Sequence, residues 1–290
     1  MKNDPNDFFS LLKKHNVRMS KSLGQNFLHD RNVAAKIIEG GDFTKEDLVI
    51  EVGPGTGSLT LGIAEKAGKV LAVEIDKNLV SLLEERTRGY ANIDICHKDI
   101  LKADITKDLL ERYPEYPEYK VISNLPYYIT TAIIMKFLQH SHAPESMVLM
   151  MQKEVANRIC GKTGTKEYGS LSIAVQYYCK PEKLMNVSPG CFTPRPDVMS
   201  TVVRLEKRKT PGVSVKNKEM FFKTVKSAFA QRRKKAVNSI SSTLGIPRDK
   251  VEEVFLTHGL DPLKRAEQLC MEDFARISDS LVGLSESLSH

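Results

Sequence analysis

The chain has 290 residues, of which 41% are hydrophobic, which is enough for one full α/β domain and a smaller partner domain. Lysine and arginine outnumber aspartate and glutamate by 43 to 36, and the resulting charge of +7 favours a polyanionic partner without requiring one. The five cysteines form no CxxC pair, which argues against a disulfide scaffold or a zinc knuckle, so we expect no metal site.

No stretch reaches the roughly 18 apolar residues that a membrane helix needs. The first residues mix Asp4 and Asp7 with Lys13 and Lys14 and lack an uninterrupted apolar run, so they resemble neither a secretory signal nor a transit peptide. We therefore expect a soluble, cytoplasmic protein without a membrane partner, acting as a monomer.

The first half of the chain alternates helical patterns with short apolar runs. Asp30 can cap a helix that Gly40-Gly41 would end, with Val33, Ile37 and Ile38 on its apolar face. Strands that alternate with helices predict a parallel, doubly wound sheet covered on both faces. The runs that we assign to strands are Leu48 to Val52, Val70 to Ile75, Ile93 to Cys96, Lys120 to Ser123 and Met147 to Met151.

The pattern changes in the second half. Helical spacing over residues 171–178 precedes two predicted strands, Lys183 to Val187 and Val198 to Leu205, around a Pro/Gly-rich loop. Residues Glu206 to Lys218 turn polar and basic, as is typical of a linker. We therefore predict a first domain of residues 1–206.

The tail is predicted to be helical. Residues Met220 to Leu244 and Lys250 to Leu256 follow helical patterns, with Gly245-Ile246-Pro247 between them. We predict a small helical domain of residues 207–290. Its basic runs, Lys207 to Lys209 and Arg232 to Lys235, offer a phosphate-binding surface for RNA.

Three features at predicted strand ends indicate a nucleoside-containing cofactor. Glu51 to Gly57 reads EVGPGTG, and its glycines allow a tight turn that brings backbone N–H groups close to a ligand. Glu74 ends the second strand, where a carboxylate can accept from ribose hydroxyls, and Asp99 follows the third strand at the same edge of the sheet. An NAD-dependent oxidoreductase stays possible on these features alone, although the glycine spacing lacks the third glycine of GxGxxG.

The fourth strand is followed by Asn124-Leu125-Pro126-Tyr127. Pro126 has no backbone N–H and favours an extended Leu125, so the Leu125 carbonyl can face outwards as an acceptor. Acceptors beside an aromatic ring suit the amine of a planar base. Hydrogen bonds from both amine N–H groups to Asn124 and to this carbonyl would aim the nitrogen lone pair at an electrophilic methyl group, and no general base is required.

Together these segments resemble the ribosomal RNA adenine dimethyltransferases, most closely the bacterial small-subunit (KsgA/RsmA) type. The resemblance covers nearly the whole chain, and its most specific part is Lys21 to Leu28, KSLGQNFL. It implies a Rossmann-like class I methyltransferase domain, S-adenosyl-L-methionine as cofactor, and dimethylation of two adjacent adenines near the 3′ end of 16S RNA in immature small ribosomal subunits. Further matching segments are Glu51 to Thr60, Asn124 to Tyr127, Met151 to Val155, Phe192 to Pro196 and Gln231 to Lys234.

The resemblance also implies roles for single residues. Asn26 and Leu28 would close over the cofactor, Gly53 would lie under its methionine part, and Asn124 would touch both cofactor and target amine. Tyr127 and Phe192 would sandwich the target adenine, which must leave its stack to be reached. The residues implied at the cofactor are Gln25, Asn26, Leu28, Gly53, Gly55, Glu74, Ile75, Asp99, Ile100 and Asn124, and those implied at the acceptor are Asn124, Leu125, Pro126, Tyr127 and Phe192.

One departure from the family pattern is Met199, where an acidic residue is expected. Two other functions remain open. The first is a large-subunit adenine methyltransferase that confers antibiotic resistance, against which Gly24 and the basic tail segment argue. The second is an RNA-binding ribosome assembly factor in which methylation is secondary, against which the complete set of acceptor residues argues. Without the resemblance, Phe192 would be read as an aromatic side chain that fills the core.

Overall fold

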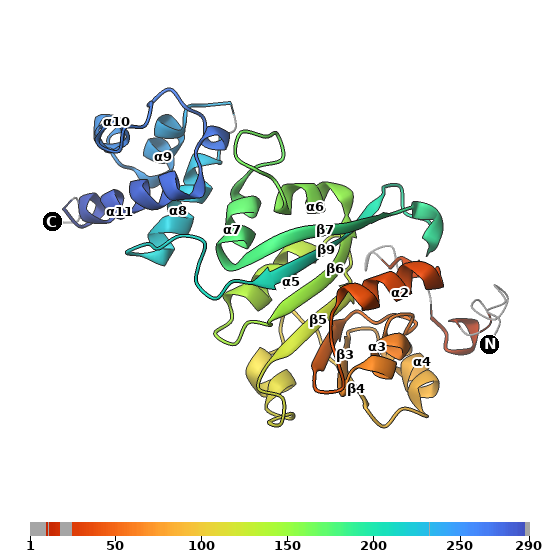
Figure 1. Cartoon of the computed structure of the whole chain (residues 1–290). Helices are drawn as coiled ribbons and strands as arrows, with labels where there is room; N and C mark the ends of the chain where they lie inside the picture. Colours follow the sequence, from red (N-terminus) through yellow and green to blue (C-terminus); the bar gives the residue numbers. More distant parts are fainter. Residues whose placement is uncertain (1–9, 11, 18–24, 232, 288–290) are drawn as a thin grey trace. The chain divides into compact units, whose positions relative to one another are not determined.

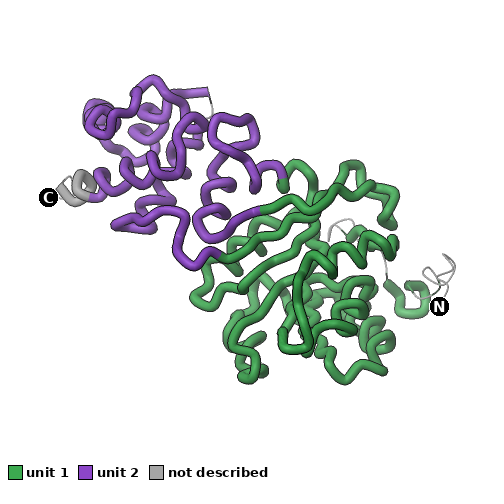
Figure 2. The backbone as a smooth tube through the Cα atoms, viewed as in Figure 1, with its two compact units in different colours: residues 1–156, 182–207 green, residues 157–181, 208–290 purple. Residues whose placement is uncertain are grey.

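The computed structural model describes residues 10, 12–17, 25–231 and 233–287, without the side chains of residues 283–287 (Figure 1). Residues Lys21 to Gly24 of the KSLGQNFL segment and Arg232 of the basic tail lie outside the described residues. The chain forms two compact units, unit 1 of residues 1–156 and 182–207 and unit 2 of residues 157–181 and 208–290 (Figure 2).

The path of the chain between the units differs from the predicted single boundary after residue 206. The chain changes unit three times, after residues 156, 181 and 207. Residues 157–181 group with the tail because Ile173 and Tyr177 are buried in the same apolar cluster as Phe221. Unit 2 is therefore assembled from two separate segments of sequence.

Unit 1 is built on a seven-stranded sheet with the order β4-β3-β2-β5-β6-β9-β7. The pairs β2/β3, β3/β4, β2/β5 and β5/β6 are parallel, whereas β9 runs antiparallel to β6. The predicted mostly parallel α/β sheet is thus confirmed, and each predicted strand is present. The strands are β2 (Leu48–Val52), β3 (Lys69–Glu74), β4 (Ile93–His97), β5 (Tyr119–Asn124), β6 (Ser146–Gln152), β7 (Cys179–Val187) and β9 (Ser200–Lys207).

The central strands are apolar without alternation because both faces of the sheet are covered. All five residues of β2 are buried. On one face, helix α2 (Arg31–Gly40) contributes Ile37 and helix α3 (Thr60–Lys66) contributes Ile63 to the cluster that contains Val49 and Ile122. As predicted, Asp30 caps α2, accepting from the backbone N–H groups of residues 32 and 33 at 2.9 and 3.1 Å.

A second, two-stranded sheet was not predicted. Strand β1 (Phe27–Leu28) pairs antiparallel with β8 (Phe192–Thr193), although the two segments lie far apart in the sequence. None of the helices in the described part of the chain combines the length and apolar character that a bilayer crossing needs. The remaining elements of unit 1 are α4 (Lys77–Thr87), a π-helical turn (Ile105–Leu110), α5 (Thr130–Gln139), a 3₁₀ turn (Pro189–Cys191) and α6 (Lys153–Ile159), which runs into unit 2.

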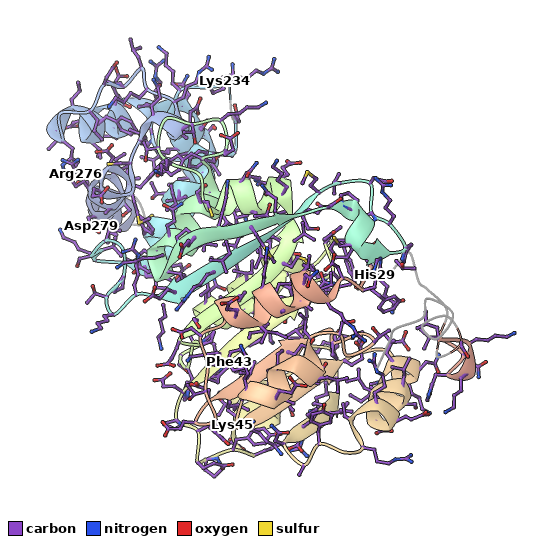
Figure 3. All side chains as sticks on the ribbon, turned by 45° about the vertical axis from the view of Figure 1, so that its right-hand side comes forward. His29, Phe43, Lys45, Lys234, Arg276 and Asp279 are labelled. Carbon is purple, nitrogen blue, oxygen red and sulfur yellow. The ribbon has the colours of Figure 1, made fainter. Side chains whose placement is uncertain are left out.

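Unit 2 is helical, as predicted, but the continuous helix predicted over Met220 to Leu244 is wrong. Helix α8 ends at Ala228. The next residue, Phe229, packs against Tyr168 and Phe274, with ring centroids 6.1 and 5.8 Å apart. The following basic run has no apolar side chain to bury, and Lys234 lies at the surface (Figure 3). The helices are α7 (Ser170–Tyr178), α8 (Lys218–Ala228), α9 (Ala236–Leu244), α10 (Arg248–Thr257) and α11 (Met271–Ser287), with a 3₁₀ turn at Ala266–Gln268.

Candidate active site

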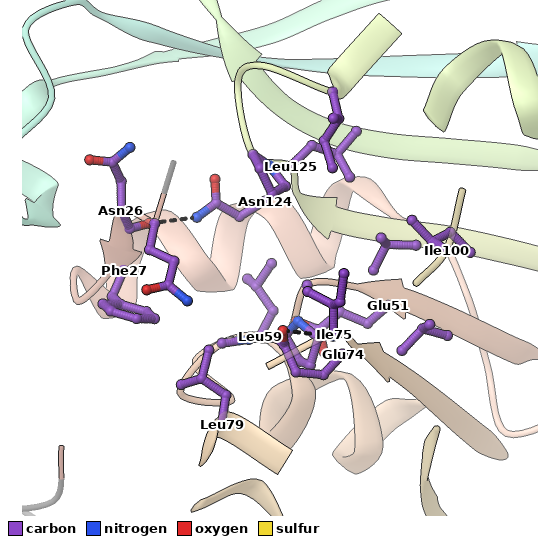
Figure 4. A pocket seen from close by; sticks show the side chains of 18 of the residues that line it. Asn26, Phe27, Glu51, Leu59, Glu74, Ile75, Leu79, Ile100, Asn124 and Leu125 are labelled. Carbon is purple, nitrogen blue, oxygen red and sulfur yellow. Dashed lines mark hydrogen bonds between the residues drawn. The ribbon is translucent and has the colours of Figure 1, made fainter. Parts of the chain in front are cut away.

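A cavity of about 270 Å³ lies at the carboxyl ends of β2, β3 and β5 (Figure 4). The chain runs from β2 outward through β3 and β4 and then returns to β5 on the other side of β2. Such a reversal of strand order opens a crevice at the carboxyl ends of the strands, which is where ligands bind in open α/β sheets. The volume is close to the lower end of the range for small-molecule pockets.

The turn after β2 forms the floor of the cavity. Gly53, Gly55 and Gly57 have φ angles of +65°, +59° and +80°, a region that other L-residues rarely adopt. A Cβ atom on Gly55 would lie 3.1 Å from the Phe27 ring. Glycine at this position therefore serves both the turn and the close approach of Phe27, which lines the cavity.

Glu74, at the end of β3, is held in one position by backbone donors. Its Oε1 accepts from the N–H groups of Ile75 and Asp76 at 2.9 and 3.0 Å, and its Oε2 accepts from Gly55 at 3.2 Å. Burial raises the pKa of the Glu74 carboxyl, and these three hydrogen bonds oppose that effect. Because a carboxylate oxygen has two acceptor sites, Oε2 can take a further hydroxyl donor from a ligand in the cavity.

A second acid, Glu51, lies in the wall of the cavity and is 1% exposed. The Thr60 hydroxyl donates to its Oε2 at 2.6 Å. Burial raises the pKa of Glu51 to about 8, with a smaller contribution from the nearby Glu74. Glu51 belongs to the glycine motif of the sequence, but no role was predicted for it; its position at the start of that motif, ahead of the first glycine, was the available signal.

The residues that follow β4 contribute another part of the cavity wall. Asp99 lines it and also accepts from the backbone N–H of Leu101 at 2.9 Å, so the acid has both a capping contact and a place in the site. Ile75 and Ile100 line the same region. Ile100 is buried, while Ile75 is 49% exposed.

On the acceptor side, the Asn124 amide is oriented by residues 25–28, which line the cavity. Its Nδ2 donates to the Asn26 carbonyl at 3.0 Å (Figure 4). Because the planar amide carries its donor Nδ2 and its acceptor Oδ1 on separate bonds, this bond uses the donor side and leaves Oδ1 as an acceptor.

Leu125, Pro126 and Tyr127 continue the same wall. The Pro126 carbonyl accepts from the Thr130 hydroxyl at 2.9 Å, which ties the segment to the start of α5. The Tyr127 hydroxyl bonds to Ser200 Oγ at 2.7 Å, and burial raises the pKa of Tyr127. The Tyr127 ring is therefore fixed from a distant strand, β9, which sequence analysis did not connect to it.

Residues 25–28 are held by the side chains of Ser58, which follows the glycine turn, and of Asp76, which caps α4. Ser58 Oγ donates to the Leu28 carbonyl at 2.7 Å, and the Gln25 side chain donates to Asp76 at 3.3 Å. Gln25, Asn26 and Leu28 all line the cavity.

Phe192 lies elsewhere. It is 3% exposed, pairs with Leu28 across β1 and β8, and belongs to the buried cluster that contains Leu59. Of the residues predicted for the site, all line the cavity except Phe192. In this structure Phe192 fills the core, and its assignment to base stacking stays a prediction. Residues of the cavity that sequence analysis missed include Phe27, Glu51, Ser58 and Leu79.

A strand-end acid, a glycine turn and an Asn-Leu-Pro-Tyr segment thus share one cavity at the carboxyl ends of the strands. The last strand of the sheet, β9, lies between β6 and β7 and runs antiparallel to β6. This antiparallel strand distinguishes the sheet from the parallel order of dinucleotide-binding folds. The fold and the site define a Rossmann-like class I methyltransferase.

The sequence profile of the family described as ribosomal RNA adenine dimethylase matches residues 16–282. The chain belongs to this family. It is 46% identical over 272 residues to ribosomal RNA small subunit methyltransferase A of Alkaliphilus oremlandii, covering 93% of this chain and 94% of the relative. It is 43% identical over 281 residues to the protein of the same name in Bacillus mycoides, covering 96% of each.

Solved structures agree with this assignment. A dimethyladenosine transferase from Plasmodium falciparum matches with a TM-score of 0.71 and 25% identity over 90% of this chain and 98% of that one. The 23S rRNA methyltransferase ErmE matches with a TM-score of 0.68 and 28% identity over 89% of this chain and all of the other.

This protein is therefore an rRNA adenine methyltransferase that uses S-adenosylmethionine. The cavity fits that cofactor. Glu74 has an acceptor position left for a ribose hydroxyl. Gly53 and Gly55 place no side chain in the floor, and Ile75 and Ile100 offer apolar surface for a purine ring.

Proposed function

We propose that this enzyme dimethylates N6 of two adjacent adenines near the 3′ end of small-subunit (16S) ribosomal RNA, as a step in the biogenesis of the small subunit. The names of the relatives that are 43 to 46% identical support this choice of RNA. The observation that carries transfer to an amine is the bond from Asn124 Nδ2 to Asn26, because it leaves Oδ1 to accept.

When bound, S-adenosylmethionine supplies an electrophilic methyl group. In the first transfer, Asn124 Oδ1 and the Leu125 carbonyl accept the two N–H groups of the adenine amine, which reduces the delocalisation of its lone pair into the ring. In the second transfer one N–H remains, and one of these two acceptors holds it. Tyr127, whose hydroxyl is bonded to Ser200, stacks on one face of the base. One amine proton is lost to water after each transfer. Positioning and electrostatics perform the catalysis.

For the surroundings of the reaction, we propose that the enzyme acts as a cytoplasmic monomer on immature small subunits. No metal ion is needed in this mechanism, since the methyl donor is already electrophilic. Methyl transfer should therefore persist when a chelator is added together with enough magnesium to keep the free magnesium that the particle needs constant.

For unit 2 we propose RNA docking through the exposed basic run at Arg233 and Lys234. The run at Lys207 to Lys209 is a weaker candidate. Lys207 Nζ donates to the Ala143 carbonyl at 3.0 Å, and Arg208 Nε donates to the Gln176 carbonyl at 2.9 Å. Replacing Arg233 and Lys234 with alanine should weaken RNA binding and lower its salt dependence by about two counterions.

The test of the main proposal uses labelled cofactor with unmethylated small-subunit particles and, separately, with large-subunit RNA. We expect label on adenine N6 of the small-subunit RNA. Label that appears only in the large-subunit RNA would make the chain a large-subunit enzyme, as ErmE is named. RNA binding without label would favour the assembly-factor function.

Asn124→Ala tests the mechanism. Turnover should fall by about 10² to 10³-fold, the usual cost of removing one preorganised polar group at a reacting centre, while RNA affinity changes little. Asn186→Ala is the matched control, because the Asn186 amide bonds to the Thr201 hydroxyl at 2.9 Å and does not line the cavity. Unchanged turnover in Asn124→Ala would refute the mechanism.

A further inference from the structure

Large apolar side chains are left exposed at one edge of the sheet of unit 1. Among the described residues seven large hydrophobic side chains are exposed, and five of them lie at this edge. Ile75 and Leu101 follow β3 and β4, and Tyr128 follows β5; all three also line the cofactor cavity. Val198 and Met199 precede β9, whose first residue pairs with the last residue of β6. Clustered exposed apolar groups mark a binding surface, whereas scattered ones are ordinary.

Tyr128 is the aromatic member of this group. It is 59% exposed and lines the mouth of the cavity. The neighbouring Tyr127 is anchored through its hydroxyl on Ser200 at 2.7 Å. No comparable hydrogen bond holds Tyr128 among the residues that the structure describes, so its ring is available to an incoming molecule.

The chemistry of the substrate says what this ring can receive. A target adenine must leave its stack to reach the cavity, and its departure removes one stacking partner from each neighbouring nucleotide. Single-stranded RNA compensates for such losses by stacking bases on exposed aromatic side chains. Two exposed cations at the same edge, Lys153 at the start of α6 and Arg195 before β9, can meet the accompanying phosphates.

We propose that Tyr128 is the stacking platform for the nucleotide that directly adjoins the target adenine, and so forms a second base-binding position at the mouth of the cofactor cavity. This inference rests on the proposed function for its RNA. The Tyr128 ring then contributes to holding the strand in register while the target base is inside the cavity.

The test is a double-mutant cycle between protein and RNA. The full-length enzyme binds, in the presence of cofactor, small-subunit particles whose RNA keeps a single target adenine and either is otherwise intact or lacks the base directly on the 5′ or the 3′ side of that adenine. Tyr128→Ala should weaken binding to intact RNA by roughly 5- to 150-fold, the range for one base stacked on one ring. On one of the two abasic RNAs that penalty should disappear, and Tyr128→Phe should bind all RNAs like the wild type.

Two controls make the outcome decisive. Cofactor affinity, measured by titration without RNA, should differ less than twofold between Tyr128→Ala and the wild type. An equal penalty on all three RNAs, or a loss of cofactor affinity as large as the loss of RNA affinity, would overturn the proposal and make the ring a wall of the cofactor cavity. Absence of methyl transfer by the wild type would instead count against the proposed function, because the binding cycle does not depend on turnover.

Discussion

Replacing Phe192 with alanine separates two roles for this residue, support of the fold and stacking on the target base. Its side chain is 3% exposed and belongs to the apolar cluster under strand β8. Truncation of a buried phenylalanine to alanine costs about 3 to 5 kcal/mol. One kcal/mol shifts the melting temperature of a protein of 150 to 250 residues by about 2 to 4 °C, so Phe192→Ala should melt roughly 6 to 20 °C below the wild type.

Thermal unfolding followed by circular dichroism measures this shift, and Phe192→Leu is the matched control. Leucine keeps most of the apolar volume, so its melting temperature should lie much closer to that of the wild type. Suppose instead that Phe192→Ala melts within about 2 °C of the wild type while methyl transfer is lost. The ring would then act on the substrate rather than in the core, and our reading of its burial would be wrong.

Three further changes test the walls of the cavity. Glu51→Gln should make unfolding stability less dependent on pH between about 4.5 and 8, because in the wild type only the unfolded state ionises in that window and stability falls as pH rises; a parallel pH profile would contradict the raised pKa. Gly55→Ala should lower cofactor affinity in calorimetric titration and cost about 1 to 2 kcal/mol of stability, because its φ of +59° disfavours a side chain. Gly89→Ala is the control: no atom lies near a new Cβ there, so its cofactor affinity and melting temperature should match the wild type. Leu12→Ala should weaken cofactor binding in the same titration, since Leu12 is 3% exposed and packs in one cluster with Leu79 of the cavity wall; unchanged affinity would show that the wall does not need it.

Much of unit 1 could be predicted from sequence because its strands are buried on both faces. The run Leu48 to Val52 matches β2 residue for residue, and the other runs differ from their strands by a few residues at the ends. The glycine turn and the Asn124 segment were also visible, because both depend on local backbone chemistry that is specific to glycine and proline.

Contacts between distant segments could not be predicted in the same way. Strands β1 and β8 have two residues each, too few for any periodic pattern, and the bond between Tyr127 and Ser200 joins residues 73 positions apart. The burial of Phe192 follows from that same strand pairing; it agrees with the interpretation of its sequence context as a core aromatic, whereas base stacking was implied only by the family resemblance. In unit 2 the break after Ala228 was missed because helix-forming residues continue across it, while tertiary packing of Phe229 decides where the helix stops.

The three changes of unit along the chain limit how this protein can be divided. A fragment that stops at residue 207 would keep residues 157–181 without the helices that cover Ile173 and Tyr177, so it would expose an apolar surface prone to aggregation. A tail fragment that starts at residue 208 would lack part of its own core. Neither piece is a cassette that recombination could exchange by a single crossover. Exchange of the helical unit between relatives requires the transfer of both segments together.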